Sequence, residues 1–180
     1  MNTSSLSRLW HRALQAFVVS AVIATAVAPV PAMAATLDTF MKIDGLPGES
    51  TSAQNPNEIV LSGWSQNFGT RQCSRAVATK RVDRSSPGLI ARAAANTTIP
   101  QVLVSMTRGD VGGGRPVTVF RATLDQVQID RVEIVEVDEE LVERVVLAAR
   151  SIRIEYWPIQ PNGAPGTPVA TAIACAAHDR

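Results

Sequence analysis

The sequence contains few of the residues on which catalytic and metal sites depend: two histidines, two cysteines and one tyrosine in 180 residues. The one histidine after residue 34 is His178, close to the C-terminus, where chains are usually poorly ordered. A Ser–His–acid triad, a cysteine nucleophile with an imidazole partner and a tetrahedral zinc site would each have to use it. The sequence therefore predicts no enzyme, and no catalytic, cofactor-binding or metal-ligating residues.

An excess of charge of either sign is also lacking. Seventeen basic residues stand against sixteen acidic ones, and no run of like charges forms a tail or a basic face. Nucleic acid is therefore not an expected partner. After residue 34 no apolar run reaches the roughly 20 residues that a membrane-spanning helix needs, so a soluble product without a membrane partner is expected.

The N-terminus has the three parts of a secretory signal peptide in the right order. Arg8 and Arg12 come first, and the segment 13–30 is almost wholly apolar. Ala32-Met33-Ala34 then supplies the small residues that signal peptidase recognises. We expect cleavage after Ala34.

This cleavage would divide the chain into a signal peptide, residues 1–34, and one domain, residues 35–180, which is a sufficient length for a core of its own. The product would be periplasmic or secreted. Two alternatives stay open. The apolar segment could remain as a membrane anchor, or translation could start at Met33 and leave a cytoplasmic protein.

Two cysteines lie in the expected domain, Cys73 and Cys175. If the protein is exported, an oxidising compartment favours a disulfide between them. A loop of that length contributes up to ~4.7 kcal/mol in the chain-entropy model. The alternative is two separate buried thiols, which behave as small apolar side chains.

Short runs of alternating apolar residues, separated by turn residues, indicate a mostly β fold. The runs are residues 40–43, 58–64, 102–106, 117–120, 127–137 and 152–156. The pair Asp130-Arg131 shifts the alternation, as a β-bulge would. The glycines of 109–114 predict a turn, and the prolines and glycines of 158–168 predict an irregular loop.

One helix is predicted from its capping residues and apolar spacing. Ser86 suits the N-cap, Pro87 suits the first helical position, and Asn96 suits the end. The segment 139–150 is ambiguous, because its apolar residues fit a helix as well as a strand.

Several other clusters have weak functional signals. Glu136, Asp138, Glu139 and Glu140 are acidic neighbours, which we interpret as an exposed turn between strands rather than a metal or acid–base site. The run from Gly112 to Arg115 lacks the Lys-Ser/Thr ending of a phosphate-binding loop, so a hairpin turn is favoured.

Two tryptophans and three polar residues have no specific chemical pattern. Trp64 and Trp157 fit core packing and an interface between subunits equally well. Thr79, Lys80 and Asp83 are interpreted as a strand end and a loop before the helix.

Four separated segments resemble the Hcp (haemolysin-coregulated protein) family of type VI secretion systems. Residues 37–50, which end KIDGLPGES, resemble the family's first strand and turn, and residues 58–65, EIVLSGWS, resemble its second strand. Residues 79–89, TKRVDRSSPGL, are similar to the stretch that leads into the family's main helix. Residues 143–158 are similar to the last long strands, and Pro161-Asn162-Gly163 stands at the turn that follows.

The resemblance implies a two-sheet β-barrel with one flanking α-helix, and strand rather than helix for residues 139–156. It also implies a structural role: a homohexameric ring that stacks into the secreted tube, carries small effector proteins and meets a VgrG-type spike. The alternative is an exported, stand-alone Hcp-like interaction domain that is stabilised by a disulfide and is not assembled into a tube.

Two features depart from the family pattern. Typical members have no cleavable signal peptide, and residues 33–38, MAATLD, resemble a usual family start, consistent with translation from Met33. The segment Ser65–Thr79 is shorter than the family's glycine-rich loop, which makes contacts between rings. This second departure argues against stacking more than against ring formation.

Overall fold

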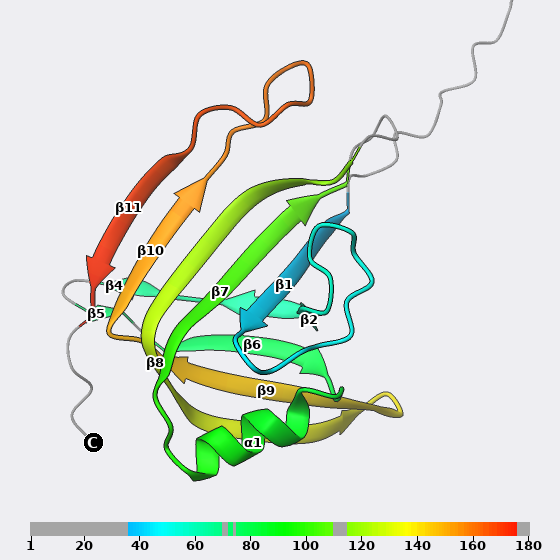
Figure 1. Cartoon of the computed structure of the whole chain (residues 1–180), viewed down its shortest axis with the longest axis vertical. Coiled ribbons are helices and arrows are strands. Elements are labelled where there is room, and N and C mark those ends of the chain that lie inside the picture. Colours follow the sequence, from blue (N-terminus) through cyan, green and yellow to red (C-terminus); the bar gives the residue numbers. More distant parts are fainter. Residues whose placement is uncertain (1–35, 70–71, 74, 110–114, 176–180) are drawn as a thin grey trace, which may run out of the picture. The chain divides into compact units, whose positions relative to one another are not determined.

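The computed structural model describes residues 36–69, 72–73, 75–109 and 115–175, and in this part the chain is mostly β-strand with one helix (Figure 1). The elements, in chain order, are β1 Leu37–Ile43, β2 Ile59–Leu61, β3 Gly63–Ser65, β4 Phe68–Gly69, β5 Gln72–Cys73, β6 Ala76–Arg81, α1 Ser86–Ala94, β7 Ile99–Arg108, β8 Val117–Val137, β9 Glu140–Ala148, β10 Ser151–Tyr156 and β11 Val169–Ala174.

The strands follow one hydrogen-bonded path, β2-β1-β7-β8-β9-β6-β3, with β10 and β11 continuing from β8. The 21-residue strand β8 belongs to both sheets, because one part of it pairs with β7 and β10 and its last part pairs with β9. The two ends of the path, β2 and β3, are separated along the chain by Ser62 alone, and the Ser62 N–H donates to the Thr79 carbonyl at 2.8 Å. The two sheets are therefore connected at one corner by β8 and at the other by Ser62. The predicted two-sheet barrel with one flanking helix is confirmed.

The inward-facing positions of the strands form one core. In β9, the inward-facing Val145 and Leu147 are fully buried, whereas Arg144, which faces outward, is exposed. This alternation with period two is the signature of a strand with one face in the core. The helical alternative for 139–150 is therefore wrong, and the strand that the resemblance implied is confirmed.

The phase shift in the sequence marks a bulge in β8. Ile129 is paired with Leu147, but the next residue in register with β9 is Arg131, which is paired with Val146. Asp130 is the extra residue, and the bulge predicted at Asp130-Arg131 is confirmed. The bulge lies where β8 passes from one sheet to the other.

The helix α1 packs on β8 through Leu89, which is fully buried, and Ala93. It begins one residue earlier than predicted: Ser85 is the N-cap and Ser86 is the first helical residue, so the prediction of Ser86 as the cap is wrong. The reason is that the Ser86 hydroxyl is used by other partners inside the barrel. Asn96 has a φ of 49°, in the left-handed region that ends many helices, as its sequence position predicts.

The C-terminal strand β11 was not predicted from the sequence. Its residues, VATAIA, are mostly small, and all but Ile173 are exposed, so they show no clear alternation. Residues 158–168 form the expected irregular connection between β10 and β11.

Some predictions fall outside the described residues. These are the signal peptide 1–34 with its cleavage site at Ala34, the glycines of 112–114, and His178. For the part that the structure describes, no helix combines the length and the apolarity needed to cross a bilayer.

Two adjacent helical residues give a direct test of how α1 is packed. We expect Leu89→Ala to lower the free energy of unfolding by about 2–5 kcal/mol, because it leaves a cavity under the helix. Ile90→Ala, a matched change at a position that is 43% exposed, should cost much less. Urea unfolding followed by circular dichroism measures both, and equal losses would show that α1 does not pack through Leu89.

Candidate functional site

The barrel interior contains a charged cluster that the sequence analysis missed. On β6 the inward-facing residues are Ala76, Ala78 and Lys80, and all three are buried. Lys80 pairs in register with Glu143 of β9, and both side chains are fully buried. Two neighbouring strands thus place opposite charges on the same inner face.

Lys80 has a partner for each of its three ammonium protons. Its Nζ lies 2.7 Å from Glu143 Oε2, 2.8 Å from Asp83 Oδ1 and 2.9 Å from Ser86 Oγ. A buried cation with an unused proton would cost free energy, whereas this geometry uses all three donors. The cluster is therefore well suited to hold a lysine inside a β-barrel.

The N-terminus of α1 completes the cluster. The Ser86 hydroxyl donates to Glu143 Oε2 at 2.6 Å and accepts from the Asp83 backbone N–H at 3.1 Å. Two carboxylates and one ammonium leave one excess negative charge, which lies beside the positive end of the helix dipole. The cluster thereby joins β6, β9 and α1.

Asp83 is the member of the cluster closest to solvent, with its side chain 11% exposed. Burial by itself would raise the pKa of Asp83. The hydrogen bond and charge of Lys80, together with hydrogen bonds from the Ser85 hydroxyl and backbone N–H, outweigh burial and lower the pKa below its usual value. Asp83 is therefore a carboxylate that favours the folded state.

Lys80 lies at the end of β6 and Asp83 lies in the loop before α1, as interpreted from the sequence, but that interpretation missed the buried cluster that they form. The signal was present in the alternation: Glu143 has the same parity as the buried Val145 and Leu147, and Lys80 has the same parity as Ala78. Neither charge is exposed to a substrate, so the cluster positions structural elements rather than performing chemistry. Thr79 is half-buried and faces the other side of β6.

The acidic cluster of 136–140 lies at the turn between β8 and β9, as interpreted from the sequence. Asp138 and Glu139 are the two turn residues, both exposed, with φ values of 50° and 65°. Glu140 forms an ion pair with Arg81 at 2.8 Å. Among the described residues, no group of three or more His, Cys, Asp or Glu side chains is arranged to hold a metal ion.

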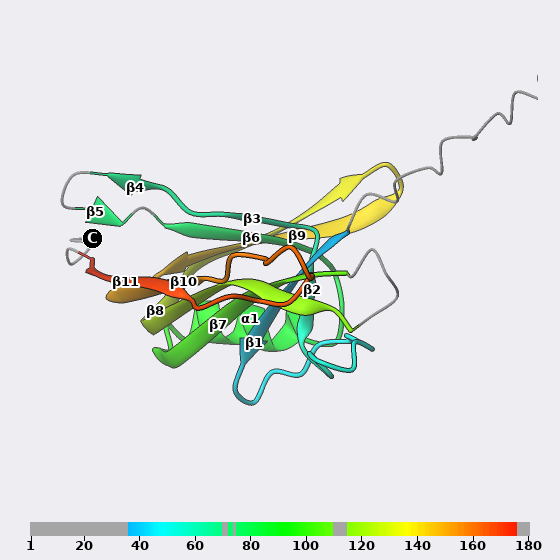
Figure 2. The ribbon, with the colours of Figure 1, turned by 90° about the horizontal axis from the view of Figure 1, so that it is seen from above.

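Apolar side chains are exposed at two separate places. The first, here called the hairpin surface, lies on one face of the β8–β9 hairpin near its end and consists of Val82, Ile134 and Leu141, which are 38–55% exposed. The second, here called the edge surface, consists of Tyr156 and Val169, where β10 meets β11. The hairpin and the β10–β11 edge are different elements of the fold (Figures 1 and 2).

The two tryptophans have different environments. Trp64 is half-buried and packs against the core. The ring of Trp157 lies under the guanidinium of Arg121, with Cζ 5.3 Å from the ring centroid. Core packing thus accounts for Trp64, whereas Trp157, which is also half-buried, makes a cation–π contact.

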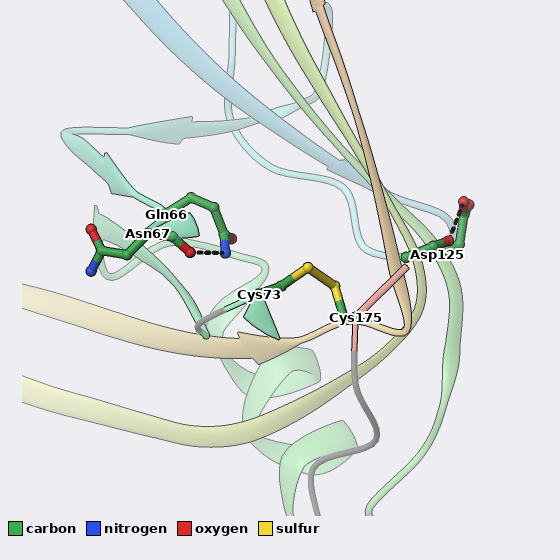
Figure 3. Close-up of a disulfide and its surroundings, with 6 residues drawn as sticks. Gln66, Asn67, Cys73, Asp125 and Cys175 are labelled. Atoms are coloured by element: carbon green, nitrogen blue, oxygen red, sulfur yellow. Dashed lines mark hydrogen bonds between the residues drawn. A yellow bond between two sulfur atoms is a disulfide. The ribbon is translucent and has the colours of Figure 1, made fainter. Parts of the chain in front are cut away.

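A disulfide connects Cys73 of β5 with Cys175, one residue beyond β11 (Figure 3). The two Cα atoms are 5.0 Å apart, within the range that a disulfide spans. Cys73 is buried, and the Cys175 N–H donates to the Arg150 carbonyl at 2.8 Å. The bridge attaches the short β4–β5 ribbon, within Ser65–Thr79, to the end of the β10–β11 pair.

A family model matches more than half of the chain. Residues 40–156 match the family model described as "Type VI secretion system effector, Hcp". Comparison with curated protein sequences gives no match.

Solved structures have the same fold. Hcp1 from Salmonella typhimurium is 25% identical with a TM-score of 0.68, over 77% of this chain and 94% of that one. A type VI secretion system effector from Yersinia pestis is 21% identical with a TM-score of 0.65, over 76% and 99%. The secreted protein Hcp3 from Pseudomonas aeruginosa is 15% identical with a TM-score of 0.61, over 80% and 100%.

Removal of one partner tests the buried cluster. We expect Glu143→Leu to lower the free energy of unfolding by about 3–5 kcal/mol, because it leaves Lys80 buried without its main counter-charge. The double variant Lys80→Met with Glu143→Leu should recover part of that loss. The control is Glu140→Leu, which removes the exposed partner of Arg81 on the same strand and should cost about 0–1 kcal/mol. Equal losses for Glu143→Leu and Glu140→Leu in urea unfolding would contradict the assignment.

The lowered pKa of Asp83 predicts a pH dependence with a definite sign. A carboxylate whose pKa is depressed in the folded state contributes stability above its unfolded pKa of about 3.9, and this contribution is lost as the pH falls through the folded value. Asp83→Asn should therefore flatten the loss of stability below about pH 4, whereas the exposed control Asp44→Asn should leave it unchanged. Unfolding midpoints measured across this range check the prediction, and parallel curves for wild type and Asp83→Asn would refute it.

Proposed function

The chain belongs to the Hcp family of type VI secretion system proteins, and from this membership we propose that it forms hexameric rings of the secreted tube. The resemblance found in the sequence is thereby confirmed. This is not an enzyme family, so the prediction that the chain is not an enzyme is confirmed as well.

The observation that carries the ring proposal is the pair of exposed apolar surfaces on one protomer. A closed ring needs two different patches, because each subunit contacts one neighbour with one patch and the other neighbour with the second. The hairpin surface and the edge surface meet this requirement, since they differ in residues and lie on different elements, the β8–β9 hairpin and the β10–β11 edge (Figures 1 and 2).

The strand β11 gives further support for assembly at the edge surface. Among the described strands it pairs with β10 alone, and Val169 at its start is 69% exposed. Edge strands with exposed apolar residues tend to pair or associate unless they are covered. A neighbouring subunit would provide that cover.

Family membership also suggests the partners of the ring. Small effector proteins would travel inside it, and a VgrG-type spike would cap the stacked tube. These partners are proposals from the family alone.

Export of the chain is a further part of the proposal. We propose that residues 1–34 direct export, that cleavage follows Ala34, and that the domain 35–180 reaches an oxidising compartment. The closeness of Cys73 and Cys175 supports this proposal, because a structural disulfide is suited to such a compartment.

Purification of the protein separately from periplasm and cytoplasm tests the ring and its compartment together. Light scattering should give the mass of a hexamer, the N-terminal sequence should begin at Ala35, and thiol titration should find no free cysteine in the periplasmic sample. An intact disulfide with a monomeric mass would instead favour a stand-alone exported domain. A cytoplasmic hexamer beginning at Met33 would refute export but would leave the ring proposal standing.

A further inference from the structure

A groove of about 500 Å³ lies over β7 and β8, between the loop that precedes β2 and the loop that follows β10. Val104 and Ala122 point into the core, so their neighbours Ser105 and Arg121 point to the opposite, outer face of the sheet. Ser105 and Arg121 are paired in register and lie side by side in the groove. The groove is also lined by Gln54, Asn55, Glu58, Thr118 and Trp157.

Asn55 provides a buried acceptor without a partner. Its side-chain amide donates to Glu58 Oε2 at 3.0 Å and to Ser105 Oγ at 3.2 Å, and the residue is 8% exposed. Rotation of the amide by half a turn would direct Oδ1 at the Glu58 carboxylate, so the orientation is fixed. Oδ1 has no hydrogen-bond partner within the described structure, a state that costs free energy unless a donor arrives.

Arg121 provides the matching donor. Its Nε is buried, and no hydrogen-bond acceptor reaches it from the described residues. The guanidinium is held over Trp157, which fixes its plane. The groove is therefore lined by one residue with an unused donor and a positive charge and by one with an unused acceptor, and Glu58 adds a negative charge beside Asn55.

The turn of the β8–β9 hairpin has the complementary chemistry. Asp138 and Glu139 supply exposed carboxylates for Arg121. The ladder of this hairpin ends at the pair Val137–Glu140, so the backbone N–H groups of the two turn residues lie beyond it and can donate to Asn55 Oδ1. A single turn thus offers both groups that the groove lacks.

We propose that the Asp138–Glu139 turn of one protomer inserts into the Arg121–Asn55 groove of the next protomer. The proposal rests on the ring described above and names the contact that closes it. The hairpin turn lies at the lower right of Figure 1 and the loop after β10 at its top, and Figure 2 separates them as well. Each protomer can therefore give its turn to one neighbour and receive the turn of another, as a ring requires.

A pair of charge reversals tests this contact. Arg121→Glu places like charges in the groove and the incoming turn, and Glu139→Arg does so with the opposite sign. Each variant alone should raise the concentration needed for half-assembly by roughly tenfold or more. When the two are co-expressed with different tags, alternating protomers restore an opposite-charge pair at every contact, so rings containing both tags should form.

Matched controls separate this contact from general charge effects and from misfolding. Arg153→Glu changes a 55% exposed arginine on β10, and Asp44→Arg changes an exposed acid in the loop after β1. Both should assemble like wild type. Glu139 is an exposed turn residue, so its replacement should leave the circular dichroism spectrum and the unfolding midpoint unchanged.

The outcomes distinguish this contact from the ring itself. If wild type forms hexamers and both charge reversals do so equally well, the contact is overturned and the ring survives. If wild type forms open chains that each reversal disrupts and the mixture restores, the contact stands and the closed ring does not. A wild-type monomer overturns both.

Discussion

The fold depends on one buried ion pair, Lys80 with Glu143. These residues are paired in register across β6 and β9, and a slip of one residue in either strand would turn the charge outward and leave its partner buried alone. Ser86 extends the same cluster to the first residue of α1. The pair therefore fixes the register of one sheet and the position of the helix.

The same alternation that fills the core explains why apolar side chains remain exposed. The β8–β9 hairpin continues beyond the end of β6 at Arg81, and Leu141 lies in this extension. Leu141 and Ile134, which pairs with Glu143, keep the inward-facing phase of Glu143. No opposite sheet covers them there, since both remain about half exposed. The hairpin thus has apolar residues at inward-facing positions that its own barrel does not cover. A neighbouring subunit would cover them.

Much of the fold could be predicted from the sequence, because strands, turns and the bulge at Asp130 leave local signals. The choice between helix and strand for 139–150 could not, since it is decided by pairing with distant strands. Lys80 was missed because its counter-charge, Glu143, is remote along the chain and a lysine is rarely buried. The unpaired atoms Asn55 Oδ1 and Arg121 Nε could not be predicted from the sequence either. Their environment depends on how the loop before β2 folds and on the register of β7 with β8.

Electron microscopy of the purified, assembled protein tests the central claim most directly, that a single heterologous contact between copies of this chain closes a ring. The account predicts a six-membered ring in which the density of each β8–β9 turn enters the neighbouring groove beside Arg121 and Trp157. A ring with these turns free in solvent would contradict the proposed contact. Particles of single protomers at high concentration would contradict the account as a whole.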